Sequence, residues 1–351
     1  MRFRLYLQRA KNSMWHAGLR LVSTTLVSAW HKGSNSSLSI NPKRSRLVLR
    51  SLVVGVERVV APVGPYGLRL VAVGATLCMT AACSDVPDDT SAADAGSSTR
   101  LIQLWSADTP AFGVFVPNER PGGEVAPDGS RLPPLYTSEG GASLGENPLL
   151  DYLFLNLEGS YDAEAVAAIA EGLDESNSEG APSLLVRIPP IERDGAETAR
   201  ARVLEALQLG ADGVVIPHVR SPEEARLAVS FFADAGASVW SPDNPDGETL
   251  AMIMIEDAGA LATAGEIADT PGYSVLACGI GSLSGDLGSR EAGETGTQEV
   301  LQHSERVGLP NMITANAQDV EQRLEEGFLG LLMSGPGADE AIRIGRSASG
   351  R

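Results

Sequence analysis

Two acidic residues each follow an apolar run of the sequence and have the chemistry of ligands for a hard cation. Glu256 closes the run 250–255, and Asp286 lies just beyond the run 273–279. If the two runs are parallel strands joined by a helix, both carboxylates come to the same edge of the sheet. Carboxylate oxygens with positions left for water and substrate suit Mg²⁺ or Mn²⁺. The alternative is that Glu256 only complements a helix N-terminus and Asp286 is a turn residue.

Two further side chains with useful chemistry lie near the ends of apolar runs. Arg187 interrupts the run 183–189, and a guanidinium among buried neighbours is costly unless it has a partner. Its fork of donors suits a carboxylate or a developing enolate oxygen, and the alternative is a surface salt bridge. His218 ends the run 213–219, which makes it a candidate acid or base or, alternatively, a residue that merely caps the structure.

Eight apolar runs must position these side chains, and helix-like segments with an apolar stripe separate most of them. We expect strands at 112–116, 151–159, 183–189, 213–219, 250–255, 273–279, 311–315 and 328–333. This alternation predicts a (β/α)₈ TIM barrel, in which all the strands end at one face. An open, doubly wound sheet is the alternative, but no G-x-G-x-x-G motif follows a first strand to support it.

Two stretches have the composition of irregular loops. Residues 118–148 are rich in Gly, Pro and charge, with no expected helix, and are interpreted as a lid over the strand ends or as a disordered insertion. Residues 281–285 form a Gly/Ser stretch that we expect to be a loop.

Three ordered motifs resemble one enzyme family. The segment 250–288 has an apolar strand ending in I-E, a helix, and a second strand that leads into Gly and Asp-Leu. Upstream, LLVRIP at 184–189 and LGADGVVIPHVRSPEEARLAV at 209–229 match further motifs in the same order. Together they resemble the HpcH/HpaI aldolase/citrate lyase family, typified by 4-hydroxy-2-oxoheptanedioate aldolase. The resemblance implies a TIM barrel of the pyruvate/phosphoenolpyruvate-binding type.

The resemblance also implies a reaction, the cleavage of a 4-hydroxy-2-oxo acid to pyruvate and an aldehyde. A divalent cation, Mg²⁺ or Mn²⁺, held by Glu256 and Asp286 would chelate the 2-oxo acid, and Arg187 would bind the oxo or enolate oxygen. The stretch containing Gly281, Ser282 and Ser284 would hold the substrate carboxylate through backbone N–H groups.

The sequence departs from the family at the proton-transfer position. The family's D-x-E-H motif reads Asn156-Leu157-Glu158-Gly159, and glycine cannot move a proton. His218, Glu158 or a metal-bound hydroxide are therefore the candidates for the catalytic base.

The metal-ligand register is also ambiguous. Ser284 occupies the aspartate position if Gly281 is aligned, whereas the Asp-Leu pair selects Asp286. We expect Asp286, because two carboxylates supply the charge that a hard dication needs.

Two other functions are weighed against the lyase. One is a catalytically degenerate barrel that binds a small acidic metabolite at the cell envelope. The other is lyase or hydrolase chemistry on an acyl-CoA, for which no basic patch suited to CoA phosphates is visible. A small 2-oxo acid and further copies of the same chain, in a homo-oligomer, are the expected partners.

Charge divides the chain into regions. Residues 1–83 carry 12 of the 27 Lys and Arg residues and one of the 45 acidic residues, so the remainder carries 15 basic and 44 acidic ones, a net charge of about −29. Such acidity excludes a broad nucleic-acid-binding surface. We expect a basic leader at 1–83, of which part can precede the true translation start, a flexible acidic linker at 84–99 and the barrel at 100–351.

The leader ends in an export-like signal. The apolar run 70–82 is too short to span a bilayer but suits a signal-peptide core, and its last small residues precede Cys83 as at a bacterial lipoprotein cleavage site. We therefore expect a lipid on Cys83 and an exported protein, periplasmic or membrane-anchored through that lipid alone. The alternative is a cytoplasmic protein with a non-functional leader. No Cys/His cluster has the spacing of a zinc site.

Overall fold

The structure is a computed structural model that describes residues 99–351 apart from 121, 123 and 177–179. The described residues belong to a single compact unit. The predicted export signal and Cys83 lie outside the described residues. Within the described part, no helix has both the length and the apolar character needed to cross a membrane.

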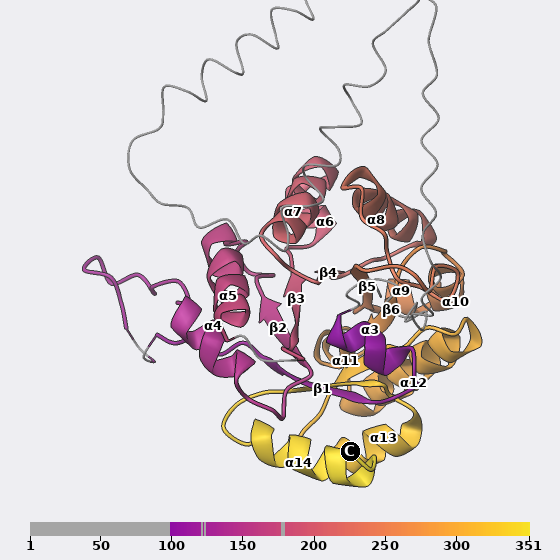
Figure 1. The fold of residues 1–351 in the computed structure, drawn as a ribbon. Coiled ribbons are helices and arrows are strands. Elements are labelled where there is room, and N and C mark those ends of the chain that lie inside the picture. The colour runs from indigo at the N-terminus through magenta and orange to yellow at the C-terminus, as the bar shows by residue number, and fades with distance from the viewer. Residues whose placement is uncertain (1–98, 121, 123, 177–179) are drawn as a thin grey trace, which may run out of the picture. The chain divides into compact units, whose positions relative to one another are not determined.

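Eight parallel strands close into a barrel in sequence order, and β8 pairs with β1 (Figure 1). The strands are β1 Ala111–Phe115, β2 Tyr152–Asn156, β3 Ser183–Arg187, β4 Gly213–Ile216, β5 Leu250–Ile255, β6 Val275–Cys278, β7 Asn311–Thr314 and β8 Gly330–Met333. The predicted (β/α)₈ fold is confirmed, and each predicted run contains most or all of one strand.

The strands read as continuous apolar runs because both of their faces are buried. One hydrophobic cluster fills the barrel interior, with Phe154, Met252 and Met312 among its members, while residues such as Leu153 and Ile253 pack outward in a second cluster that includes helix residues. The interior is therefore filled with side chains, and a site has to lie at an end of the barrel.

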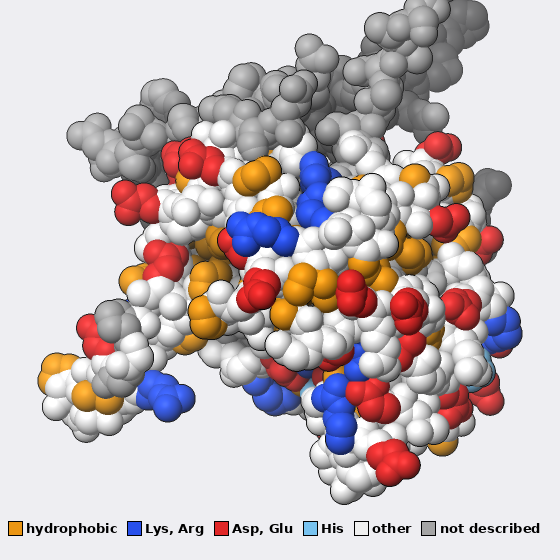
Figure 2. All heavy atoms as spheres, turned by 90° about the horizontal axis from the view of Figure 1, so that it is seen from below, with side chains coloured by type: hydrophobic (Ala, Val, Ile, Leu, Met, Phe, Trp, Pro, Cys, Tyr) orange, Lys and Arg blue, Asp and Glu red, His pale blue; other side chains and the backbone are white. Residues whose placement is uncertain are grey.

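The helices surround the strands, and most of the longer ones begin at a residue whose side chain caps the first turn, such as Asp162 before α5 and Ser221 before α8. The described helices are α3 Arg100–Trp105, α4 Ser138–Gly145, α5 Ala163–Glu175, α6 Ile191–Asp194, α7 Ala196–Gln208, α8 Pro222–Asp234, α9 Ala258–Leu261, α10 Ala264–Ala268, α11 Ile280–Asp286, α12 Arg290–Arg306, α13 Val320–Glu326 and α14 Ala338–Ala348. Acidic side chains are spread over the face shown in Figure 2, in keeping with the acidic composition.

A buried ion cluster ties the N-terminal end of β2 to α3 and α14. Asp151 is fully buried, and its carboxylate accepts hydrogen bonds from Arg100 Nε at 2.9 Å, Arg346 Nη2 at 2.8 Å and Arg351 Nη1 at 2.7 Å. The Phe112 N–H of β1 donates to the same carboxylate at 2.9 Å. Burial alone would raise the pKa of Asp151, but these hydrogen bonds and the neighbouring guanidinium charges outweigh burial and lower it.

The expectation of one long loop over 118–148 is wrong in its last part, where α4 forms. This glycine-containing helix packs closely on α5: a Cβ at Gly141 would lie 2.8 Å from the Ile169 carbonyl oxygen. Tertiary packing therefore stabilises a helix that propensity alone disfavours. The first part of the stretch extends sideways from the barrel in Figure 1, and none of the described residues of 118–148 lines the site pocket described below.

The expected loop at 281–285 is also helical, because these residues lie within α11. Its neighbour α12 begins at Arg290, where the Ser289 side chain caps the first turn. Close packing at Gly293, against Ser284 of α11, holds the two helices together.

Candidate active site

Four adjacent strands each bring one side chain to the C-terminal end of the barrel. Arg187 is the last residue of β3, and Glu256 follows β5 directly. Glu158 follows β2, and His218 follows β4. Because the strands are parallel and adjacent, residues far apart in the sequence converge there.

A buried ion pair lies at the centre of this cluster. Arg187 and Glu256 are 8% and 2% exposed, respectively. The Arg187 Nη2 donates to Glu256 Oε1 at 3.0 Å and Oε2 at 2.8 Å, and it lies 3.0 Å from Glu158 Oε1. One guanidinium nitrogen therefore lies between two carboxylates.

His218 is held by both carboxylates. Its backbone N–H donates to Glu256 Oε2 at 3.1 Å, while its ring Nε2 lies 3.0 Å from Glu158 Oε1 and 3.6 Å from Glu256 Oε2. Its φ of 52° lies in the left-handed region, which a non-glycine residue adopts only when its surroundings hold it there. The strained backbone conformation directs the N–H to Glu256.

The contact between His218 and Glu158 favours a charged pair. The hydrogen bond with Glu158 raises the pKa of His218 against the opposing effect of burial, and the charges of Glu256 and Glu158 add to the rise. The same hydrogen bond lowers the pKa of Glu158, again against burial, with help from the charges of Arg187 and His218. The four side chains then sum to zero charge: two carboxylates, a guanidinium and an imidazolium.

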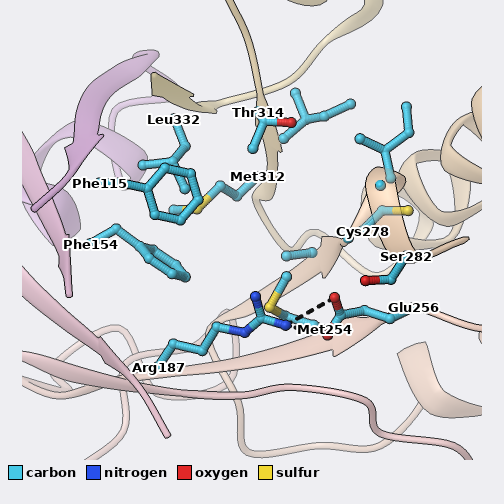
Figure 3. A pocket seen from close by; sticks show the side chains of 15 residues that line it. Phe115, Phe154, Arg187, Met254, Glu256, Cys278, Ser282, Met312, Thr314 and Leu332 are labelled. Carbon is cyan, nitrogen blue, oxygen red and sulfur yellow. Dashed lines mark hydrogen bonds and ion pairs between the residues drawn. The ribbon is translucent and has the colours of Figure 1, made fainter. Parts of the chain in front are cut away.

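A pocket of about 230 Å³ opens beside the Arg187–Glu256 pair (Figure 3). Its walls are mostly apolar, with Phe115 and Phe154 on one side and the start of α11 on another, including Gly281 and Ser282. The pocket-lining apolar residues, among them Phe115, Phe154, Met254, Met312 and Leu332, were not singled out by the sequence reasoning. They are the inward-facing residues near strand ends, which become visible only once the strand register is known.

Arg187 has hydrogen-bonding capacity left for a ligand. Its Nε is buried without a hydrogen-bond partner among the described residues, and the guanidinium faces the pocket near Phe154 and Met254 (Figure 3). An unpaired buried donor is costly, so an oxygen supplied by a bound molecule would relieve that cost.

Gly279 makes room for the Glu256 carboxylate. A Cβ on Gly279 would overlap Glu256 Oε1 and lie 2.7 Å from both its Cδ and Cγ. Sequence reasoning did not identify this residue. Its only signal is that Gly279 directly follows β6, the strand that pairs with β5, and that Glu256 directly follows β5.

The structure does not bring Asp286 to the cluster, so the expected pair of Glu256 and Asp286 is corrected. Asp286 is exposed at the end of α11, and its Oδ2 accepts a hydrogen bond from the Ala258 N–H at 2.8 Å. Ser284 points elsewhere as well: its Oγ donates to the Ile280 carbonyl at 2.6 Å, and it does not line the pocket. Because 281–285 is helical, these side chains bond to the backbone of α9 and α11.

A different set of side chains has the chemistry of a metal site. The ligand atoms of Glu158, His218 and Glu256 lie within 4.8 Å of one another. Ligands about 2.0–2.2 Å from a cation are roughly 3–4 Å apart, so a small inward movement would bring all three together. One imidazole with two carboxylates suits Mn²⁺ better than Mg²⁺, which prefers oxygen alone. The donor set fits a divalent cation.

Fold and site together define a (β/α)₈ barrel protein whose candidate active site lies at the C-terminal ends of the strands. The sequence profile of the HpcH/HpaI aldolase/citrate lyase family matches residues 149–330, and the chain belongs to this family of metal-dependent aldolases and lyases. It is 26% identical over 213 residues to the 4-hydroxy-2-oxo-heptane-1,7-dioate aldolase of Klebsiella pneumoniae, an alignment that spans 50% of this chain and 80% of that enzyme.

Solved structures show the same fold. A HpcH/HpaI aldolase/citrate lyase family protein from Burkholderia cenocepacia has a TM-score of 0.53 at 20% identity, covering 72% of this chain and 98% of that protein. The HpcH/HpaI aldolase of Desulfitobacterium hafniense has a TM-score of 0.50 at 23% identity, covering 71% of this chain and 95% of that protein.

Proposed function

We propose that the protein is a metal-dependent carbon–carbon lyase that cleaves a 4-hydroxy-2-oxo acid to pyruvate and an aldehyde. The observation that carries the proposal is Arg187, a buried arginine beside Glu256 and a pocket at the barrel mouth, one of whose donors has no partner among the described residues. Membership of the aldolase family and the similarity to the Klebsiella enzyme support it.

Glu158, His218 and Glu256 would hold the cation, in place of the pair predicted from the sequence. A divalent cation supplies a Lewis acid that polarises the 2-oxo group of the substrate. We therefore expect activity with Mn²⁺ to exceed activity with Mg²⁺, because one donor is an imidazole nitrogen.

The residues of the chain then have distinct tasks. Arg187 binds the 2-oxo oxygen and stabilises the negative charge that develops there. The carboxylate of the substrate reaches the backbone at Gly281 and Ser282, which line the same pocket. The mostly apolar walls exclude water from the enolate.

Bond cleavage needs a group that removes the proton of the C4 hydroxyl. As this proton leaves, the C4–O bond becomes a carbonyl, the C3–C4 bond breaks, and its electron pair forms the enolate of pyruvate, which is later protonated at C3. Because Glu158, His218 and Glu256 would be ligands of the cation, none of them is free to take this proton, and we assign its removal to a hydroxide bound in the site, the remaining candidate from the sequence. Gly159, at the family's histidine position, has no side chain to contribute.

A specific observation favours a second candidate, a barrel that binds an acidic metabolite without cleaving it. Gly159 lacks the family's proton-transfer group, and both carboxylates of the cluster are already paired with Arg187 and His218. A site neutralised in this way can bind a small acid through Arg187 alone.

Pyruvate release separates the two candidates. Purified protein is incubated with 4-hydroxy-2-oxo acids and Mn²⁺, Mg²⁺ or chelator, and pyruvate is measured with a coupled dehydrogenase. We expect metal-dependent release that falls at least a hundredfold in Arg187→Lys, because lysine cannot reproduce the planar fork. Arg226→Lys, on an exposed ion pair of α8, is the matched control and should be unchanged. Binding of 2-oxo acids without release from any of these compounds would instead support the second candidate.

We also propose that the protein is exported and carries a lipid on Cys83, on the evidence of the sequence at 70–83. Mass spectrometry of the membrane fraction should find a mature chain that begins at a lipid-modified Cys83. An intact chain that begins upstream of this residue would refute the proposal.

A further inference from the structure

We propose that the site selects 2-oxo acids that have a single carboxylate and an apolar chain, and that it discriminates against dicarboxylates. This inference rests on the proposed function, because it takes the pocket beside Arg187 as the substrate site. It adds the chemical class of the substrate, which follows from the lining of the pocket.

The pocket offers apolar contacts where the chain of the substrate would lie. Phe115 and Phe154, whose rings meet edge to face at 5.2 Å, form one side (Figure 3). Met254 lies near the guanidinium, and Met312 and Leu332 line the pocket towards Phe115 (Figure 3). Burying the methylenes of a substrate against such walls is favourable, because their apolar surface is removed from water. A hydrocarbon chain therefore gains affinity in this pocket.

The pocket has a cation for one carboxylate or oxo group and none for a second. Among the described residues that line it, Arg187 alone is basic. Two other arginines near the barrel mouth are already engaged: Arg193 Nη1 donates to the carbonyls of Glu158 and Gly159 at 2.8 and 2.9 Å, and Arg220 pairs with acidic side chains.

The surrounding fold makes a second negative charge still less favourable. Residues 99–351 carry 40 acidic residues against 15 arginines and no lysine. A distal carboxylate would lose its hydration among apolar side chains without gaining a charged partner.

The dimensions of the pocket allow a chain longer than that of pyruvate. Its volume is about 230 Å³, several times the roughly 30 Å³ that one water molecule takes in the liquid. Phe115 also lines a second, mostly apolar pocket of about 190 Å³, together with Val114, Leu144 and Leu150. Phe115 thus borders both pockets.

Binding of two five-carbon acids tests the charge discrimination directly. 2-Oxopentanoate and 2-oxoglutarate share the 2-oxo acid head and differ only in a terminal methyl or carboxylate. By calorimetry with Mn²⁺ present, we expect 2-oxopentanoate to bind at least tenfold more tightly. Equal or tighter binding of 2-oxoglutarate would overturn the inference.

A single added cation should reverse the preference. Thr314 lines the pocket at the exposed end of β7, so Thr314→Lys places an ammonium at the mouth without burying it in the core. We expect the ratio of the two affinities to shift at least tenfold towards 2-oxoglutarate. Thr295→Lys, the same substitution at an exposed position of α12, is the control and should leave the ratio unchanged. An unchanged ratio in Thr314→Lys would place the ligand elsewhere and refute the inference.

Cleavage assays with two substrates test the charge selectivity separately from the proposed lyase activity. 4-Hydroxy-2-oxoheptanoate and 4-hydroxy-2-oxoheptanedioate yield the same pyruvate, and we expect kcat/KM to favour the first at least tenfold. If neither compound is cleaved but the binding preference and its reversal hold, the lyase is rejected and the selectivity stands. If neither 2-oxo acid binds, both proposals are refuted.

Discussion

Substitution of Gly279 by alanine tests whether the Glu256 carboxylate must stay where it is. The added Cβ would overlap Glu256 Oε1 and approach its Cδ to 2.7 Å. The Glu256 side chain is almost fully buried and accepts hydrogen bonds from Arg187 and from the His218 N–H, so it cannot move without breaking at least one of them.

The size of the effect follows from the bonds that would be lost. A hydrogen bond to a charged group contributes about 1.5–3 kcal/mol, so we expect the free energy of unfolding to fall by about that amount. In a domain of this size, this corresponds to a decrease in Tm of roughly 3–12 °C. Because Glu256 is also a candidate metal ligand, its displacement should lower the affinity for Mn²⁺ at least tenfold, or about 1.4 kcal/mol.

Gly281, two residues further along, provides a matched control. A Cβ at this position has no atom within 4 Å, and the residue lies in α11, where alanine is favoured over glycine by about 0.5–1 kcal/mol. Gly281→Ala should therefore be as stable as the parent or slightly more so. Both variants are compared by thermal unfolding and by Mn²⁺ titration. If Gly279→Ala matches Gly281→Ala in both measurements, the carboxylate is free to move and our interpretation of the site is wrong.

Three further predictions concern other parts of the barrel. Asp151→Asn should lower the free energy of unfolding by about 3–5 kcal/mol in a urea titration, because three guanidiniums would lose their buried counter-charge. The control, Glu223→Gln in a surface ion pair, should change the free energy of unfolding little. His218 has a raised pKa in the folded state, so its pair with Glu158 stabilises the protein fully at pH values below the unfolded pKa of the imidazole and is lost as the pH rises through the folded pKa. The stability difference between the parent and His218→Asn, a residue that tolerates a positive φ, should therefore shrink between pH 6 and pH 9, and a difference that grows would contradict the assigned direction. A Cβ at Gly159 meets no atom within 4 Å, so Gly159→His should fold normally. If proton transfer limits turnover, this variant should have a higher kcat in the pyruvate-release assay. An unchanged kcat would show that proton transfer is not the limiting step.

The strands could be predicted from the sequence because their signal is local. The run 250–255 coincides with β5, since a strand buried on both faces is apolar at every position. Parallel order in a barrel then follows from the alternation of strands and helices, and this places Arg187, His218 and Glu256 at one end of the barrel.

The composition of the cluster could not be predicted in the same way. Whether Asp286 reaches Glu256 depends on whether 281–285 is a loop or a helix, and glycine and serine residues give no clear signal for either. Packing against α12 settles the question in favour of the helix, which turns Asp286 towards the Ala258 N–H instead. The contact of Glu158 with His218 joins residues 60 positions apart and has no counterpart in any local pattern.

Arg187 acts as an internal counterion. Its guanidinium lies between Glu158 and Glu256, so both carboxylates have a positive partner supplied by the chain itself. This distinguishes the site from structural metal centres, in which the free energy of metal binding is spent on folding. The same arrangement sets a limit on affinity, because a cation entering the site competes with a positive charge that is always present. Loading of the protein would then respond to the concentration of free divalent ions around it, and a guanidinium displaced from the carboxylates would become available to a substrate.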